Sequence, residues 1–159
     1  MKARQIKMQL EGTEKKIPEV ILDLKAAEEK LQNIKAKILS QNANSTGEIE
    51  KYTDCLETAY KYKWGETTFK HSAFQLEYLK DPAYYDELKC LQKEVSEYQK
   101  KVEAYPVEKC YGNIPSANEE DLKELEKYIN LVFQENYRFS SVIISKDLYT
   151  TQLNTLKGK

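Results

Sequence analysis

Residues 17–38 read IPEVILDLKAAEEKLQNIKAKI, and this stretch decides the class of fold. Its apolar residues recur in alternating steps of three and four, at Ile17, Val20, Leu24, Ala27, Leu31, Ile34 and Ile38. Such heptad spacing places one apolar stripe along a helix and presents it to a second helix. Pro18 suits the first turn of a helix, where its missing N–H removes no hydrogen bond. The pattern therefore predicts a helix over about residues 17–40.

A second heptad pattern begins directly after Asp81 and Pro82. Its apolar stripe consists of Tyr84, Leu88, Leu91, Val95, Tyr98, Val102 and Tyr105. Asp81 can cap the N-terminus of a helix whose first position is Pro82. We expect this helix over about residues 82–105. Each of the two helices would be roughly 35 Å long at 1.5 Å per residue, which suits antiparallel packing side by side.

Two further helices have less regular patterns. The first covers about residues 47–80, and the second covers about residues 117–157 with an expected break between Ser140 and Ser145, where the run SSVIIS is rich in β-branched residues. Polar segments, SQNANSTG at 40–47 and KCYGNIPSAN at 109–118, separate the helices. Together the patterns predict an all-α protein in which residues 1–159 form one bundle of about four helices with antiparallel coiled-coil packing.

Two segments allow alternative structures. Residues 3–11 alternate as a short strand would, although their apolar residues also extend the heptads of the first helix backwards. Residues 60–71, YKYKWGETTFKH, are compatible with a hairpin that turns at Gly65 and Glu66, or with a continuous helix. We favour the helix, because the apolar spacing joins both neighbouring segments without a change of register. In a helix, Gly65→Ala is expected to be neutral or stabilising.

Composition and charge bear on partners and compartment. The net charge is −1 and 32% of the residues are charged, so no overall basic field favours nucleic acid, and binding to nucleic acid is not expected. No stretch approaches the roughly 20 apolar residues of a membrane span, so we expect a soluble protein. Cys55, Cys90 and Cys110 are odd in number and widely spaced, which predicts free thiols in a reducing intracellular compartment, the cytoplasm.

The chain lacks the residue patterns of common enzyme sites. His71 is the only histidine, which excludes paired-histidine metal motifs, and neither a Gly-rich phosphate loop nor a nucleophile elbow occurs. The carboxylate clusters lack the spacing of a calcium-binding loop. We therefore predict a protein that is not an enzyme, with no catalytic residues, no metal, no cofactor and no small-molecule substrate.

Tyrosine is frequent, with twelve residues, and several lie on the apolar stripes. Tyrosine is enriched at interfaces between proteins, because it has an apolar ring and a polar tip. The candidate partner-binding residues are Tyr60, Tyr62, Trp64, Tyr84, Tyr98 and Tyr105. We predict a protein-protein interaction module, an adaptor or a structural subunit that binds a protein partner or itself. The alternative is a nucleic-acid-associated accessory protein that uses the aromatic and lysine residues of 60–71.

Overall fold

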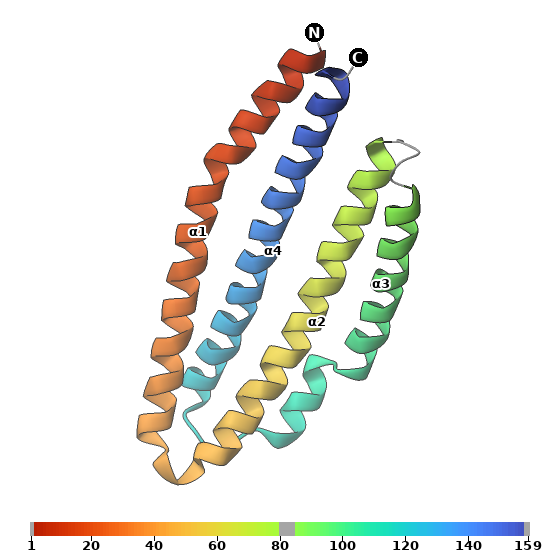
Figure 1. Ribbon diagram of the computed structural model, residues 1–159. Helices are drawn as coiled ribbons and strands as arrows, with labels where there is room; N and C mark the ends of the chain where they lie inside the picture. The colour runs from red at the N-terminus through yellow and green to blue at the C-terminus, as the bar shows by residue number, and fades with distance from the viewer. Residues whose placement is uncertain (1, 80–84, 158–159) are drawn as a thin grey trace.

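The computed structural model describes residues 2–79 and 85–157, and the α-helices in these ranges are long (Figure 1). They are α1 (Lys2–Gln41), α2 (Thr46–Leu79), α3 (Tyr85–Ala104) and α4 (Glu119–Lys157), with two 3-10 helices, η1 (Ala43–Ser45) and η3 (Val107–Asn113). The all-α prediction is confirmed. Tyr84 and the predicted start of the third helix at Pro82 lie outside the described residues.

The helices pack in the spatial order α1, α4, α2, α3. α4 lies antiparallel to α1 in the most extensive contact of the molecule, and its other side lies against α2, which runs in the same direction as α4 (Figure 1). α3 turns back and packs mainly on α2. Both termini lie at one end of the bundle, and the turn between α1 and α2 lies at the other. The helices thus form an open arrangement, with α4 as the central element between α1 and α2.

The hydrophobic core lies in the half of the bundle near the turn between α1 and α2. Its side chains come from the end of α1, the beginning of α2, η3 and the beginning of α4. Leu56, Leu125 and Ile129 are fully buried, and Ile38 from α1 joins them. The predicted apolar stripe is buried here from Ala27 to Ile38, because α1 meets both α2 and α4 in this half.

The helix α1 begins far upstream of the predicted start. It begins at Lys2, so the strand alternative for residues 3–11 is wrong, and Pro18 lies inside the helix rather than in its first turn. The heptad spacing continues backwards through Ile17, Thr13 and Leu10, and the hydroxyl of buried Thr13 donates a hydrogen bond to the carbonyl of Gln9 at 2.9 Å. Packing along α4 outweighs the local cost of a proline in the helix.

The helix α4 is continuous through the expected break. Residues 140–145 are helical, and their side chains are half-buried. The low helix propensity of β-branched residues costs only a few tenths of a kcal/mol each, which the contact with α1 outweighs. Residues 60–71 are also helical as part of α2, so the favoured alternative is confirmed and the hairpin is wrong.

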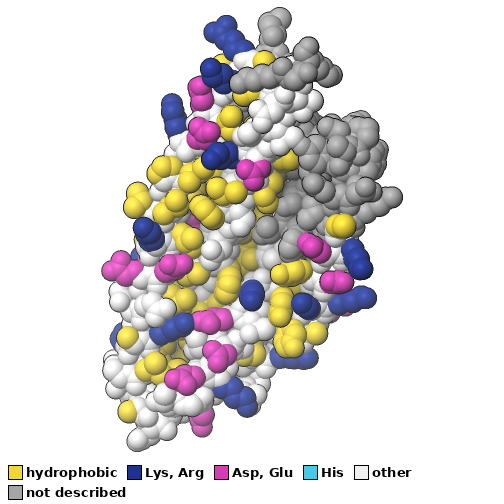
Figure 2. Space-filling model, in the orientation of Figure 1, with side chains coloured by type: hydrophobic (Ala, Val, Ile, Leu, Met, Phe, Trp, Pro, Cys, Tyr) yellow, Lys and Arg dark blue, Asp and Glu magenta, His cyan; other side chains and the backbone are white. Residues whose placement is uncertain are grey.

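The terminal halves of α1 and α4 bury less of their apolar surface than the core half does. Ile6, Leu10 and Ile17 on α1 are half-buried, and so are Phe139 and Ile143 on α4. Figure 2 shows apolar side chains gathered at the surface over this part of the two helices. The terminal halves of α1 and α4 therefore leave part of their apolar surface exposed to solvent.

Candidate functional site: a tyrosine cluster on α2 and α3

Three of the candidate residues meet on the surface formed by α2 and α3. The ring of Tyr62 from α2 lies against Tyr98 of α3, with centroids 5.9 Å apart in an edge-on contact, and against Tyr105, the residue directly after α3, with centroids 5.5 Å apart. Tyr98 and Tyr105 are seven residues apart, and Tyr105, directly after the end of α3, donates its backbone N–H to the carbonyl of Lys101 at 2.9 Å, so both rings lie on the same side. We call Tyr62, Tyr98 and Tyr105 the tyrosine cluster.

A lysine completes the surface of the tyrosine cluster. Lys101 Nζ lies 5.4 Å from the centroid of the Tyr62 ring and 5.7 Å from that of Tyr98, which are cation–π distances. Tyr105 is 51% exposed, and Lys101 is also exposed. The surface therefore presents the Tyr105 ring and the positive charge of Lys101 to solvent, beside the half-buried Tyr62 and Tyr98. Such a mixture suits a partner that offers both apolar and hydrogen-bonding groups.

Gly65 allows the close approach of α3 to α2 at the tyrosine cluster. A Cβ at position 65 would lie 2.5 Å from Cε1 and 3.0 Å from Cδ1 of Tyr98. At 2.5 Å a Cβ is too close to the ring, so alanine there requires the Tyr98 ring or the backbone near it to shift. The expectation that Gly65→Ala is neutral or stabilising considered helix propensity alone, and the contact with Tyr98 opposes that gain.

Two other candidates, Tyr60 and Trp64, point towards α4 instead. Tyr60 donates a hydrogen bond to Glu126 Oε1 at 2.8 Å, and Trp64 Nε1 donates one to Asn130 Oδ1 at 2.8 Å. The Trp64 ring also lies 5.4 Å from that of Tyr137. These contacts hold α2 against α4. The predicted set therefore divides into the tyrosine cluster and a half-buried pair, Tyr60 and Trp64, that contacts α4, and Tyr84 lies outside the described residues.

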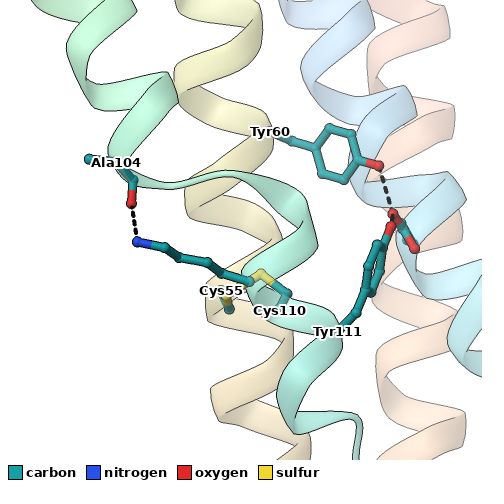
Figure 3. The surroundings of a disulfide bond; sticks show 7 residues. Cys55, Tyr60, Ala104, Cys110 and Tyr111 are labelled. Carbon is teal, nitrogen blue, oxygen red and sulfur yellow. Dashed lines mark hydrogen bonds between the residues drawn. A yellow bond between two sulfur atoms is a disulfide. The ribbon is translucent and has the colours of Figure 1, made fainter.

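A disulfide fixes η3 to α2 on the same stretch of α2 as Tyr60 (Figure 3). It joins Cys55 on α2 to buried Cys110 in η3, whereas Cys90 on α3 is free and exposed. The prediction of free thiols in a reducing cytoplasm is therefore wrong, because a disulfide indicates an oxidising environment. The pairing has no short-range sequence signal, since the two cysteines are 55 residues apart and meet only where η3 folds back on α2.

Sequence reasoning also missed a carboxylate that two tyrosines share. Tyr111 in η3 and Tyr60 on α2 both donate hydrogen bonds to Glu126 Oε1 on α4 (Figure 3). Burial raises the pKa of both phenols, and the hydrogen bond to Glu126 and its negative charge raise them further. Burial and then Glu126 also raise the pKa of Tyr52. Together with the disulfide, Glu126 connects η3, α2 and α4.

We expect the free energy of unfolding to fall as the pH rises above about 10. The pKa of tyrosine is about 10 in an unfolded chain, and it is higher for Tyr60 and Tyr111 in the folded protein. The unfolded chain therefore binds fewer protons in this range, and the stabilisation, complete below pH about 10, is lost above it. Urea unfolding from about pH 8 to 11 measures this loss in a Cys90→Ala background, which prevents thiol exchange with the disulfide.

The control for this pH dependence replaces both phenols, in the variant Tyr60→Phe with Tyr111→Phe. Its stability should fall less steeply with pH, because two of the groups that titrate on unfolding are absent. An identical slope in both proteins would show that these phenols do not carry the effect.

A metal site, a membrane span or a known relative would each give an independent indication of function. Among the side chains that the structure describes, no three from His, Cys, Asp or Glu gather as a metal ion would require. No helix in the described ranges has a stretch long and apolar enough to cross a membrane. Comparison of the chain with protein-family models, with curated proteins and with solved structures gives no match.

Proposed function

We propose that this protein is a non-enzymatic binding module, an adaptor or structural subunit, that presents the tyrosine cluster to a partner protein in an oxidising environment. The observation that carries the proposal is the gathering of Tyr62, Tyr98 and Tyr105 around Lys101 on an outer surface of the bundle. Tyrosine contributes strongly to protein interfaces, because its rigid ring contributes a large contact area at low entropic cost and its hydroxyl finds a hydrogen bond.

The alternative, nucleic-acid binding through residues 60–71, has less support. A stacking platform for bases needs aromatic rings along one accessible surface. In α2 the side chain of Tyr62 lies towards α3, whereas Tyr60 and Trp64 lie towards α4. The aromatic residues of the described part of the segment are thus divided between two sides of the helix. Binding that weakens steeply with salt would be the sign of nucleic-acid recognition.

The test is co-purification of a partner from the native source with wild-type protein and with Tyr105→Ala. We expect the variant to recover a partner at least about tenfold less well, because a tyrosine at the centre of an interface contributes about 2 kcal/mol. Tyr105 is half-exposed, so its replacement should leave the fold intact. Quantitative mass spectrometry measures the recovery.

The matched control is Tyr149→Ala, which removes a tyrosine from the terminal half of α4, away from the cluster. It should recover the partner as the wild type does. Equal recovery with wild type and Tyr105→Ala would exclude the tyrosine cluster as the binding surface.

A further inference from the structure

The turn between α1 and α2 contains a short motif that has no part in the tyrosine cluster. Residues 44–46 read Asn-Ser-Thr. An asparagine followed two positions later by serine or threonine, with any residue except proline between them, is the acceptor motif for N-linked glycosylation. The chain has eight asparagines, and Asn44 alone stands in such a motif. A pattern of three residues also arises by chance, so its structural setting decides whether it is a site.

The turn that contains Asn44 is held by hydrogen bonds of its neighbours. Asn44 is the middle residue of η1, between Ala43 and Ser45. The backbone N–H of Ser45 donates to the carbonyl of Asn42 at 2.9 Å, and the side chain of Asn42 donates to the carbonyl of Ile38 at 2.9 Å. Asn42 thus satisfies a carbonyl at the end of α1, whereas the side chain of Asn44 is exposed to solvent.

Thr46 supplies the hydroxyl of the motif at the start of α2. Its side chain is half-exposed, and its hydroxyl donates to the carbonyl of Ala43 at 3.0 Å. The space beside the motif is open, because a Cβ placed on Gly47 would meet no atom within 4 Å. The motif therefore lies on an accessible surface turn, which is the setting that N-linked glycosylation requires.

The Cys55–Cys110 disulfide indicates the kind of compartment in which this modification takes place. Disulfides persist in oxidising environments, which include the lumen of the secretory pathway. The glycosylation motif is used in secreted proteins, which pass through the same lumen. The disulfide joins α2 to η3, whereas the motif lies in the turn between α1 and α2, so two separate features of the chain agree on the environment.

We propose that Asn44 is a glycosylation site, modified in an oxidising secretory compartment. The co-substrate is an oligosaccharide whose C1 carbon is linked to a lipid diphosphate. Nδ2 of Asn44 forms a bond to C1, the bond between C1 and the phosphate oxygen breaks, and the lipid diphosphate leaves with the electron pair of that bond. One proton of the amide passes to a base of the transferase. The proposal goes beyond the proposed function, with which it shares only the oxidising environment.

A sugar on Asn44 lies at one end of the bundle, away from the tyrosine cluster. The turn between α1 and α2 is at the end opposite the two termini (Figure 1). Thr46 and Tyr62 are sixteen residues apart on α2, which corresponds to about 24 Å along the helix axis. An N-linked oligosaccharide is bulky and solubilising, so it keeps this end of the bundle in solvent. The tyrosine cluster stays accessible to a partner.

The experiment uses the full-length protein from its native source, treated with a glycoamidase, which hydrolyses the bond between asparagine and its side-chain nitrogen and so releases the sugar. We expect the intact mass to fall by the mass of the oligosaccharide. The enzyme leaves a carboxylate in place of the asparagine amide. Mass spectrometry of the tryptic peptide 38–51 should locate this change at Asn44. Hydrolysis in heavy-oxygen water distinguishes it from spontaneous deamidation.

Variants expressed in cells of the same source test the two ends of the motif. Asn44→Gln and Thr46→Ala should each lose the whole mass shift, whereas Thr46→Ser keeps the hydroxyl and should retain it. The matched control is Asn113→Gln, which changes an exposed asparagine outside the motif and should also retain the shift. Circular dichroism checks that all four variants keep the helical fold.

Three outcomes overturn the proposal. An unmodified Asn44 in the native protein would show that the motif is not used. A sugar that persists in Asn44→Gln would be attached at another residue, and one that resists the glycoamidase would be linked through a hydroxyl. None of these results depends on the recovery of a partner with Tyr105→Ala, so the glycosylation site and the tyrosine cluster can fail separately.

Discussion

Removal of the Cys55–Cys110 disulfide is expected to lower the free energy of unfolding by about 4 kcal/mol. The bond closes a loop across a sequence separation of 55 residues, and its loss frees the unfolded chain to adopt many more conformations. The double variant Cys55→Ala with Cys110→Ala leaves no buried thiol behind, and urea unfolding measures the change. The loss should loosen η3 first, because the disulfide holds η3 to α2.

The matched control for the disulfide is Cys90→Ala, which removes the exposed free thiol and should leave stability unchanged within about 0.5 kcal/mol. Wild-type protein treated with reductant should unfold like the double variant. If reductant and the double variant both left the unfolding curve in place, the disulfide would not stabilise the fold, and the inference of an oxidising environment would lose its support.

Replacement of Ile129 by alanine is expected to cost about 3 kcal/mol or more. Ile129 is fully buried on α4, where the core cluster joins α4 to α1 and α2. Truncation removes apolar contacts and leaves a cavity that the rigid surroundings fill only in part. Thermal and urea unfolding of the variant, compared with those of wild type, measure the loss.

Ile114→Ala is the control for Ile129→Ala, because it makes the same chemical change at a position that is 57% exposed. Its effect should stay within about 0.5 kcal/mol. Equal effects of the two substitutions would mean that α4 does not form the centre of the core.

The heptads predicted the helices well where local pattern and tertiary packing agree. The stripe from Ala27 to Ile38 is buried as expected, because a spacing of three and four residues keeps these side chains on one face whatever the partner helix is. Helix ends were less predictable. Pro18 and the SSVIIS run weaken helix formation locally, but α1 and α4 continue through them because each gains contact with the other over the whole length.

The candidate site was predictable in part. Tyr98 and Tyr105 follow from the heptads of residues 82–105, because residues seven apart share a face. Which side of α2 each aromatic residue takes could not be derived from α2 alone. Tyr62 meets α3, and Tyr60 meets Glu126, because α2 lies between two helices that arrive from distant parts of the sequence.

The sequence by itself determined the class of fold, the position of the buried stripe and the common side taken by Tyr98 and Tyr105, since all three depend on side-chain periodicity along the chain. Only the tertiary structure decided that Cys55 meets Cys110, that Gly65 receives the ring of Tyr98 and that α1 and α2 diverge over α4. Each of these features joins residues that are distant in the chain. Their contact depends on how whole helices pack, because no local preference of either residue contains information about the other.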